Sequence, residues 1–122
     1  MNLVTARAVV TWLSSIAADS TLGPPFRDGL ASPGGVGTLK RRFATVSSDA
    51  ALRAKTGTLT NVSALSGYVT TADGEQVVFA MLSNGNRASV DSAHAAEERL
   101  VLLLSRYRRP VPIGPPFEQV PR

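Results

Sequence analysis

Two strand-like runs separated by a turn signal constrain the fold of this 122-residue chain most strongly. The first run spans residues 62–71, and the second, EQVVFAMLSN, spans residues 75–84. Between them stands Asp73-Gly74, a dipeptide that strongly favours a tight β-hairpin turn. A third strand-like run, residues 52–60, comes directly before these two. Because strands joined by short turns pair antiparallel, the sequence predicts a three-stranded antiparallel sheet.

Two amphipathic helices are predicted to pack on this sheet. The first spans residues 5–18, where Thr5 can cap the helix and apolar residues recur at spacings of three and four. The second spans residues 89–107 and can cover one sheet face. Residues 77–82 are almost continuously apolar, which favours a strand covered on both faces. The predicted class is therefore α+β. The apolar stripe of the second helix comprises Val90, Ala93, Ala96, Leu100, Leu103, Leu104 and Tyr107.

The segments outside these elements are rich in glycine and proline. DSTLGPPFRDGLASPGGVG, residues 19–37, predicts a long loop, and such a loop is typically a lid, a binding loop or a sign that part of a fold is missing. Thr38 can cap a short helix over LKRRFATV, residues 39–46. We assign residues 1–109 to one domain and predict an extended, proline-rich tail over residues 110–122.

Composition argues against several classes of protein. A hydrophobic content of 43% and a charged content of 18% are typical of a globular domain. No apolar run approaches the ~20 residues that span a bilayer. The N-terminus lacks a signal-peptide pattern, so the chain alone is expected to stay in the cytoplasm. With no cysteine and one histidine, the sequence predicts no metal site, and it predicts no cofactor.

Other catalytic and binding patterns fit poorly. GGVGTLK has the wrong spacing for a phosphate loop. A serine-histidine-aspartate triad would need His94, which lies mid-helix among alanines and is interpreted as a solvated or packed residue. The cations of SRYRRP, residues 105–110, suit the end of a helix, and an anionic envelope polymer is the alternative. Nucleic acid is not a predicted partner, because basic and aromatic residues do not alternate.

The first predicted strand carries three residues that do not suit a buried strand: Lys55, Thr56 and Gly57. Lys55 and Gly57 share one strand face, since side chains alternate. A glycine lets a ligand approach closely, an ammonium can hold a carboxylate, and a sheet edge can pair with a peptide. These features describe a site for a peptide that ends in an anion. The alternative is an edge strand protected by a lysine, and the residues alone do not decide between the two.

A resemblance favours the site. K-T-G, together with S-x-x-K and S-D-N, is the signature of β-lactamases and penicillin-binding proteins. GTLKRRF and LRAKTGTLTNVSALSGYVTTADGEQVVFAMLSN resemble the C-terminal part of the D-alanyl-D-alanine carboxypeptidase/endopeptidases, the class C low-molecular-mass penicillin-binding proteins. The resemblance covers about residues 1–105. It implies a partial β-lactamase/transpeptidase-like fold, acyl transfer outside the cytoplasmic membrane, and the peptidoglycan D-Ala-D-Ala stem peptide and β-lactams as ligands.

The resemblance also implies a role for each residue of the motif. Lys55 would bind the terminal carboxylate of the peptide or of penicillin and tune the proton network around the nucleophile. Thr56 would hydrogen-bond the same carboxylate, and Gly57 would let the substrate backbone lie against the strand. Thr58 would supply its backbone N–H as one half of the oxyanion hole. Asn2 would be the last residue of the family's serine-asparagine loop and a further substrate contact.

The chain lacks two of the three motifs of the family pattern. It contains no S-x-x-K, because Gly37 and Leu52 stand three residues before its two lysines, and it contains no intact S-x-N. Since covalent catalysis needs an activated hydroxyl, the chain alone is predicted to form no acyl-enzyme. Three interpretations stay open: the C-terminal portion of a carboxypeptidase or endopeptidase, a non-catalytic module that binds peptide or cell wall, and a truncated product without activity.

The last predicted strand raises a separate expectation. In the fold that the resemblance implies, strands from a preceding N-terminal portion pair with residues 76–83. Without such a neighbour this apolar strand forms an open sheet edge. An open apolar edge favours self-association of the chain.

Overall fold

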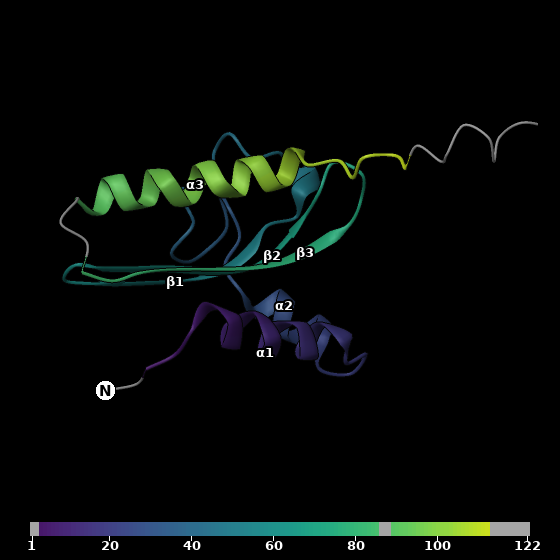
Figure 1. Ribbon diagram of the computed structural model, residues 1–122, viewed down its shortest axis with the longest axis horizontal. Helices are drawn as coiled ribbons and strands as arrows, with labels where there is room; N and C mark the ends of the chain where they lie inside the picture. The colour runs from purple at the N-terminus through teal and green to yellow at the C-terminus, as the bar shows by residue number, and fades with distance from the viewer. Residues whose placement is uncertain (1–2, 86–88, 113–122) are drawn as a thin grey trace, which may run out of the picture.

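The computed structural model describes residues 3–85 and 89–112, which form a sheet between two layers of helices (Figure 1). Helix α3 lies over one face of the sheet, and α1 and α2 lie over the other. The strands are antiparallel and stand in the order β1-β2-β3. These features confirm the predicted α+β class and three-stranded sheet. In chain order the elements are α1 (Ala6–Ala18), α2 (Gly23–Gly29), a short 3-10 helix (Ser48–Ala50), β1 (Arg53–Leu59), β2 (Val62–Thr70), β3 (Gln76–Ser83) and α3 (Val90–Arg106).

Side-chain caps fix the beginnings of the two long helices. The Thr5 hydroxyl accepts a hydrogen bond from the Ala8 N–H at 3.0 Å, and the Ser89 hydroxyl accepts one from the Ser92 N–H at 3.1 Å. Each cap satisfies an amide that the first helical turn leaves without a partner. Both predicted helices are confirmed to within one residue at each end.

The two faces of the sheet carry different side chains. On the α3 face, Leu65, Val69 and Phe79 join the main hydrophobic core with Val101 of the helix. On the α1 face, Tyr68 is buried, and its hydroxyl donates to the carbonyl oxygen of Leu13 at 2.8 Å. β3 is therefore covered on both faces, as its apolar run predicts, although most of its side chains are only half-buried at the sheet edge.

Two predictions for the segment between α1 and β1 are wrong. Residues 39–46 form turns rather than a short helix, because Phe43 takes a left-handed backbone conformation (φ 62°) and buries its side chain in the core. This tertiary contact outweighs local helix propensity. The predicted loop contains a helix, Gly23–Gly29, whose first turn accommodates prolines. It packs on α1 through an edge-to-face contact of Trp12 with Phe26, with ring centres 5.8 Å apart.

The buried face of α3 also differs from the predicted stripe. The helix buries Ala93, Glu97 and Val101, which are spaced four residues apart. A charged residue therefore lies at the centre of the contact, which hydrophobic periodicity cannot reveal. Several members of the predicted stripe are exposed instead: Val90, Ala96, Leu103 and Tyr107.

A buried ion pair fastens the turns before β1 to α3. Glu97, which is 3% exposed, accepts hydrogen bonds from Arg42 Nη2 at 3.1 Å and from Ser63 Oγ at 2.8 Å. Arg42 Nη2 also donates to the carbonyl oxygen of His94 at 3.3 Å. The pair links three elements, and removal of one partner would leave a buried charge without compensation.

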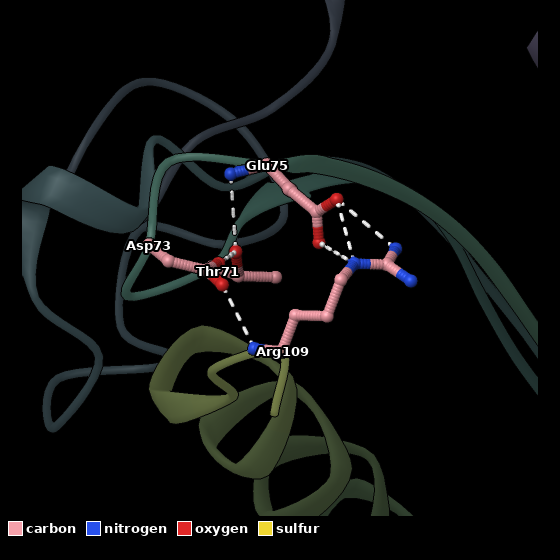
Figure 2. A network of polar contacts seen from close by, with 4 residues as sticks. All are labelled: Thr71, Asp73, Glu75 and Arg109. Carbon is pink, nitrogen blue, oxygen red and sulfur yellow. Dashed lines mark hydrogen bonds and ion pairs between the residues drawn. The ribbon is translucent and has the colours of Figure 1, made fainter. Parts of the chain in front are cut away.

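A second polar network fastens the residues after α3 to the turn between β2 and β3 (Figure 2). Arg109 donates from Nε and Nη2 to the Glu75 carboxylate at 3.1 and 3.0 Å, and its backbone N–H donates to Asp73 Oδ2 at 2.8 Å. The Thr71 hydroxyl and this N–H hold the pKa of Asp73 below its ordinary value. The predicted tail falls largely on residues 113–122, outside the described part, so the domain boundary remains a prediction.

β3 is an edge strand, and among the residues that the structure describes no strand pairs with its outer side. Its eight residues include no charged residue and no proline, the features that commonly guard such an edge. Beside the edge, a groove of about 300 Å³ separates β3 from α3, with Met81, Leu82 and Ala96 among its lining residues. This surface suits the self-association that the sequence predicts.

We expect Arg42→Ala to lower the free energy of unfolding by about 3–5 kcal/mol, because Glu97 would stay buried without its partner. Urea denaturation measures the change. Arg41→Ala, at the exposed neighbouring position, is the matched control and should change the free energy by less than about 0.5 kcal/mol. Equal effects of the two substitutions would show that the buried pair does not stabilise the fold.

We also expect the chain to self-associate through the β3 edge, which sedimentation velocity would show as a rise in sedimentation coefficient with concentration. Leu82→Lys should reduce the association, because a charge at the edge opposes strand pairing. Val36→Lys places the same charge at an exposed loop position and should have no effect. A monomeric profile for the unsubstituted chain at high concentration would contradict the expectation.

Candidate functional site

The residues of the K-T-G motif lie in β1, at the edge of the sheet opposite β3. Lys55 pairs across the strands with Ser66, and Gly57 pairs with Ala64. These pairs share the α1 face with Tyr68, because side chains two residues apart on a strand point the same way. Thr56 of the motif and Thr58, which follows the motif, point to the α3 face, as do Leu65 and Ser63 across the strands.

A hydrogen bond of Ala54 shows which way the backbone groups of β1 point. Its N–H donates to the carbonyl oxygen of Ala31 at 2.9 Å, on the side away from β2. Both backbone groups of a strand residue point to the same side, and every second residue repeats the direction. Thr56 and Thr58 therefore also present their N–H and C=O groups to the outer edge, where a peptide can pair with them.

Lys55 extends to the same outer edge. Its side chain is exposed, and Nζ donates to the carbonyl oxygen of Thr56 at 2.6 Å. Residues 53–70 include two cations, Arg53 and Lys55, and no acidic residue. No carboxylate in the described part of the chain forms an ion pair with Lys55. The local charge thus favours a bound carboxylate.

Gly57 leaves space that the fold does not use. A Cβ at this position would lie 3.5 Å from the Cβ of Ala64, which is an ordinary contact. Gly67 of β2 differs, because a Cβ there would overlap the carbonyl oxygen of Arg53. The glycine of β2 is therefore needed for strand pairing, whereas the glycine of the motif leaves room for a ligand to approach the strand.

The motif lies on an open strand edge and not in a closed cavity. A cavity of about 270 Å³ begins at Leu59, just beyond it, and continues along the hairpin to Ser89 and Val90. Ser66 faces Lys55 across the strands, yet Nζ donates to the backbone rather than to this hydroxyl. The geometry shows no activated serine beside the motif within the described residues.

Sequence reasoning missed two neighbours of the motif, Arg53 and Ala31. Arg53 shares a strand face with Lys55, and its Nη1 donates to the carbonyl oxygens of Asp28 at 3.2 Å and Leu30 at 3.1 Å. Backbone carbonyl oxygens accept both hydrogen bonds from Arg53. The carbonyl oxygen of Ala31 likewise accepts the hydrogen bond from the Ala54 N–H. Since every residue carries a carbonyl, no sequence signal could have identified these partners. Another predicted site residue, Asn2, lies outside the described residues.

The comparisons with known proteins agree with the family resemblance and with the fold. Residues 1–107 match the D-Ala-D-Ala carboxypeptidase 3 (S13) family. The chain belongs to this family. The structure of penicillin-binding protein 4 (dacB) from Haemophilus influenzae superposes with a TM-score of 0.71 and 27% identity, over 87% of this chain and 25% of that one. This match confirms the predicted fold class as well as the family resemblance.

Curated relatives show the same similarity. D-alanyl-D-alanine carboxypeptidase of Actinomadura sp. is 32% identical over 115 residues, which is 87% of this chain and 20% of the relative. Carboxypeptidase Rv3627c of Mycobacterium tuberculosis is 38% identical over 88 residues, 68% of this chain and 19% of the relative. Carboxypeptidase DacB of Mycolicibacterium smegmatis is 39% identical over 79 residues, which is 58% of this chain and 17% of the relative. The chain thus spans about a fifth of the length of these relatives. None of its described helices has the length and apolar character needed to cross a membrane.

The two glycines generate a paired prediction on stability. Gly57→Ala should leave the free energy of unfolding unchanged to within about 1 kcal/mol, because the added methyl group meets only an ordinary contact. Gly67→Ala should lower it by about 1–3 kcal/mol or more, because the added atom forces β1 and β2 apart. Urea denaturation of the two variants makes the comparison. A larger loss of unfolding free energy for Gly57→Ala than for Gly67→Ala would contradict the conclusion that only Gly67 is needed for strand pairing.

Proposed function

We propose that this chain forms the carboxylate-binding and oxyanion-stabilising part of a serine-type D-Ala-D-Ala carboxypeptidase or endopeptidase. The enzyme acts by acyl transfer on peptidoglycan stem peptides outside the cytoplasmic membrane. The observation that supports this most directly is the outer edge of β1, where the N–H groups of Thr56 and Thr58 have no backbone acceptor among the described residues and the Lys55 ammonium lies beside them, on the carbonyl oxygen of Thr56. Membership of the S13 family supports the reaction class.

Each residue of the motif has a role in the proposal. Lys55 Nζ leaves its backbone acceptor and binds the terminal carboxylate of the peptide at the strand edge. The Thr56 hydroxyl, which comes from the opposite face of β1, would reach the same carboxylate around this edge as a second donor. Gly57 lets the peptide backbone approach the strand closely. The Thr58 N–H donates to the carbonyl oxygen under attack and stabilises the negative charge that develops there. The same groups would hold the carboxylate and the carbonyl oxygen of a β-lactam.

In the proposal, the nucleophilic serine and its general base do not come from these residues. The 122 residues contain no S-x-x-K, and Lys55, which lies across from Ser66, directs its ammonium to the carbonyl oxygen of Thr56. The second half of the oxyanion hole would be the N–H of the same absent nucleophile. This chain on its own therefore binds substrate and β-lactam without a covalent step.

A second candidate is a non-catalytic module that holds stem peptides. The open edge of β1 favours it, since an edge strand can bind an extended peptide through backbone hydrogen bonds alone. The two candidates assign the same residues to the carboxylate and differ in whether acyl transfer ever follows.

We expect fluorescent penicillin to leave no label on this chain after denaturing electrophoresis, because no activated hydroxyl is present to form an ester. A longer product of the same gene that carries S-x-x-K should retain the label. Label on the 122-residue chain that survives denaturation would contradict the assignment of the nucleophile. A longer product that carries S-x-x-K and takes no label would favour the non-catalytic module.

We expect Lys55→Ala to weaken binding of a labelled peptide ending in D-Ala-D-Ala by about 10- to 100-fold, as loss of a charge-assisted hydrogen bond implies. Fluorescence anisotropy at fixed salt measures the affinity. Lys40→Ala removes the other lysine of the chain and is the matched control. Gly57→Ala should also weaken binding, because its methyl group occupies the space left for the peptide. Equal affinities of the Lys55 and Lys40 variants would overturn the proposed carboxylate site.

A further inference from the structure

The segment after α2 fills the outer edge of β1 just before the motif. Ala31 forms an antiparallel bridge with Ala54, and the antiparallel direction places Leu30 toward Lys55. The N–H of Ala54 is therefore occupied, whereas the N–H of Thr56 has no backbone acceptor among the described residues and its carbonyl oxygen accepts only the Lys55 ammonium. The outer edge of β1 is therefore covered at Ala54, near the beginning of the strand, and we call this covered part the closed end of the edge.

This closed end is firmly held. Arg53 Nη1 donates to the carbonyl oxygens of Asp28 and Leu30, at 3.2 and 3.1 Å, and the Ala54 N–H donates to the carbonyl oxygen of Ala31 at 2.9 Å. The Ala31 side chain also packs against the hydrophobic core. Two of these hydrogen bonds and a core contact thus fix Leu30 and Ala31, which have no regular secondary structure beyond one bridge, and the third ties Arg53 to the end of α2.

We propose that Leu30 and Ala31 form an end stop that admits only the C-terminal residue of a peptide to Lys55. The inference rests on the proposed function, which places the terminal carboxylate at Lys55 and Thr56 and the carbonyl under attack at Thr58. That order makes the peptide run antiparallel to β1, with its C-terminus toward the stop. With the attacked carbonyl at Thr58, the terminal residue lies across from Gly57 and its carboxylate reaches Thr56 and Lys55. Two further residues would need the places across from Thr56 and Lys55, and Leu30 already fills the second of these.

The end stop determines which peptides can bind. A peptide with a free terminal carboxylate ends before the stop and places its charge at the ammonium. A peptide extended by further residues must either leave the strand edge or displace the segment, and displacement breaks the hydrogen bonds that hold it. Arg53 is then a positioning residue, because it acts on the peptide only through residues 28–31.

The test is competition against a labelled D-Ala-D-Ala peptide on the 122-residue chain, measured by fluorescence anisotropy. The competitors share one sequence and end either in D-Ala-D-Ala or in D-Ala-D-Ala-Gly-Gly, both with free carboxylates. The unsubstituted chain should bind the extended peptide at least about tenfold more weakly, as loss of the charge-assisted bonds implies. Arg53→Ala should reduce this discrimination to near unity by releasing the segment, and Arg53→Lys should restore part of it. Arg27→Ala, in the last turn of α2, is the matched control and should discriminate like the unsubstituted chain.

The outcomes separate the two proposals. Binding of neither peptide would overturn the proposed carboxylate site and the end stop together. Equal binding of both would leave the carboxylate site standing and overturn the end stop. Unchanged discrimination in Arg53→Ala would overturn the positioning role of Arg53. Should Arg53→Ala fail to fold, amide hydrogen exchange in the unsubstituted chain decides: protection of the Ala54 N–H supports the stop, and exchange at the rate of an open amide overturns it.

Discussion

The close pairing of β1 with β2 determines the geometry of everything else in the candidate site. Gly67 permits this pairing, because any side chain there would collide with the backbone of β1. The register that follows turns the backbone groups of Thr56 and Thr58 outward and brings Lys55 and Gly57 to one face. A shift of the β1–β2 register by one residue would turn the backbone groups of Thr56 and Thr58 toward β2 and move Lys55 and Gly57 to the other face. Strand side chains and backbone groups both alternate with a period of two.

The rest of the fold holds this hairpin from both sides. On one side, Glu97 of α3 binds Ser63 of β2 and Arg42 of the preceding turns, so a single buried carboxylate connects helix, sheet and turns. On the other side, the Tyr68 hydroxyl binds the backbone of α1. Arg109 then fastens the end of α3 to the far turn of the sheet through Glu75 (Figure 2). The hairpin that carries the motif is thus held from both sides, which suits the proposed alignment of a peptide on its edge.

Local signals in the sequence predict the regular elements well. The Asp73-Gly74 turn and the caps at Thr5 and Ser89 depend on residues only a few positions apart, and the corresponding elements lie where they are expected. The K-T-G motif can likewise be recognised in the sequence, because a lysine and a glycine do not suit a buried strand. Its position on an edge strand follows from the chain order of the three strands.

Tertiary contacts explain what the sequence could not show. Phe43 leaves helical geometry to reach the core, and Glu97 faces inward because Arg42 and Ser63 meet it there. The partial closure of the β1 edge depends on a hydrogen bond between Ala31 and Ala54, two residues without any functional side chain. Contacts of this kind join distant parts of the chain through backbone groups, so no motif or periodicity records them.

Residue-resolved amide hydrogen exchange along β1, with and without a D-Ala-D-Ala peptide, shows whether the outer edge of this strand receives a peptide. We expect slow exchange of the Lys55 and Gly57 amides, which face β2, and fast exchange of the Thr56 and Thr58 amides, which face the open edge. Addition of the peptide should slow exchange at the two threonines and leave residues 40–48 unchanged. Slow exchange at Thr56 and Thr58 without peptide, or no effect of the peptide on them, would contradict the account.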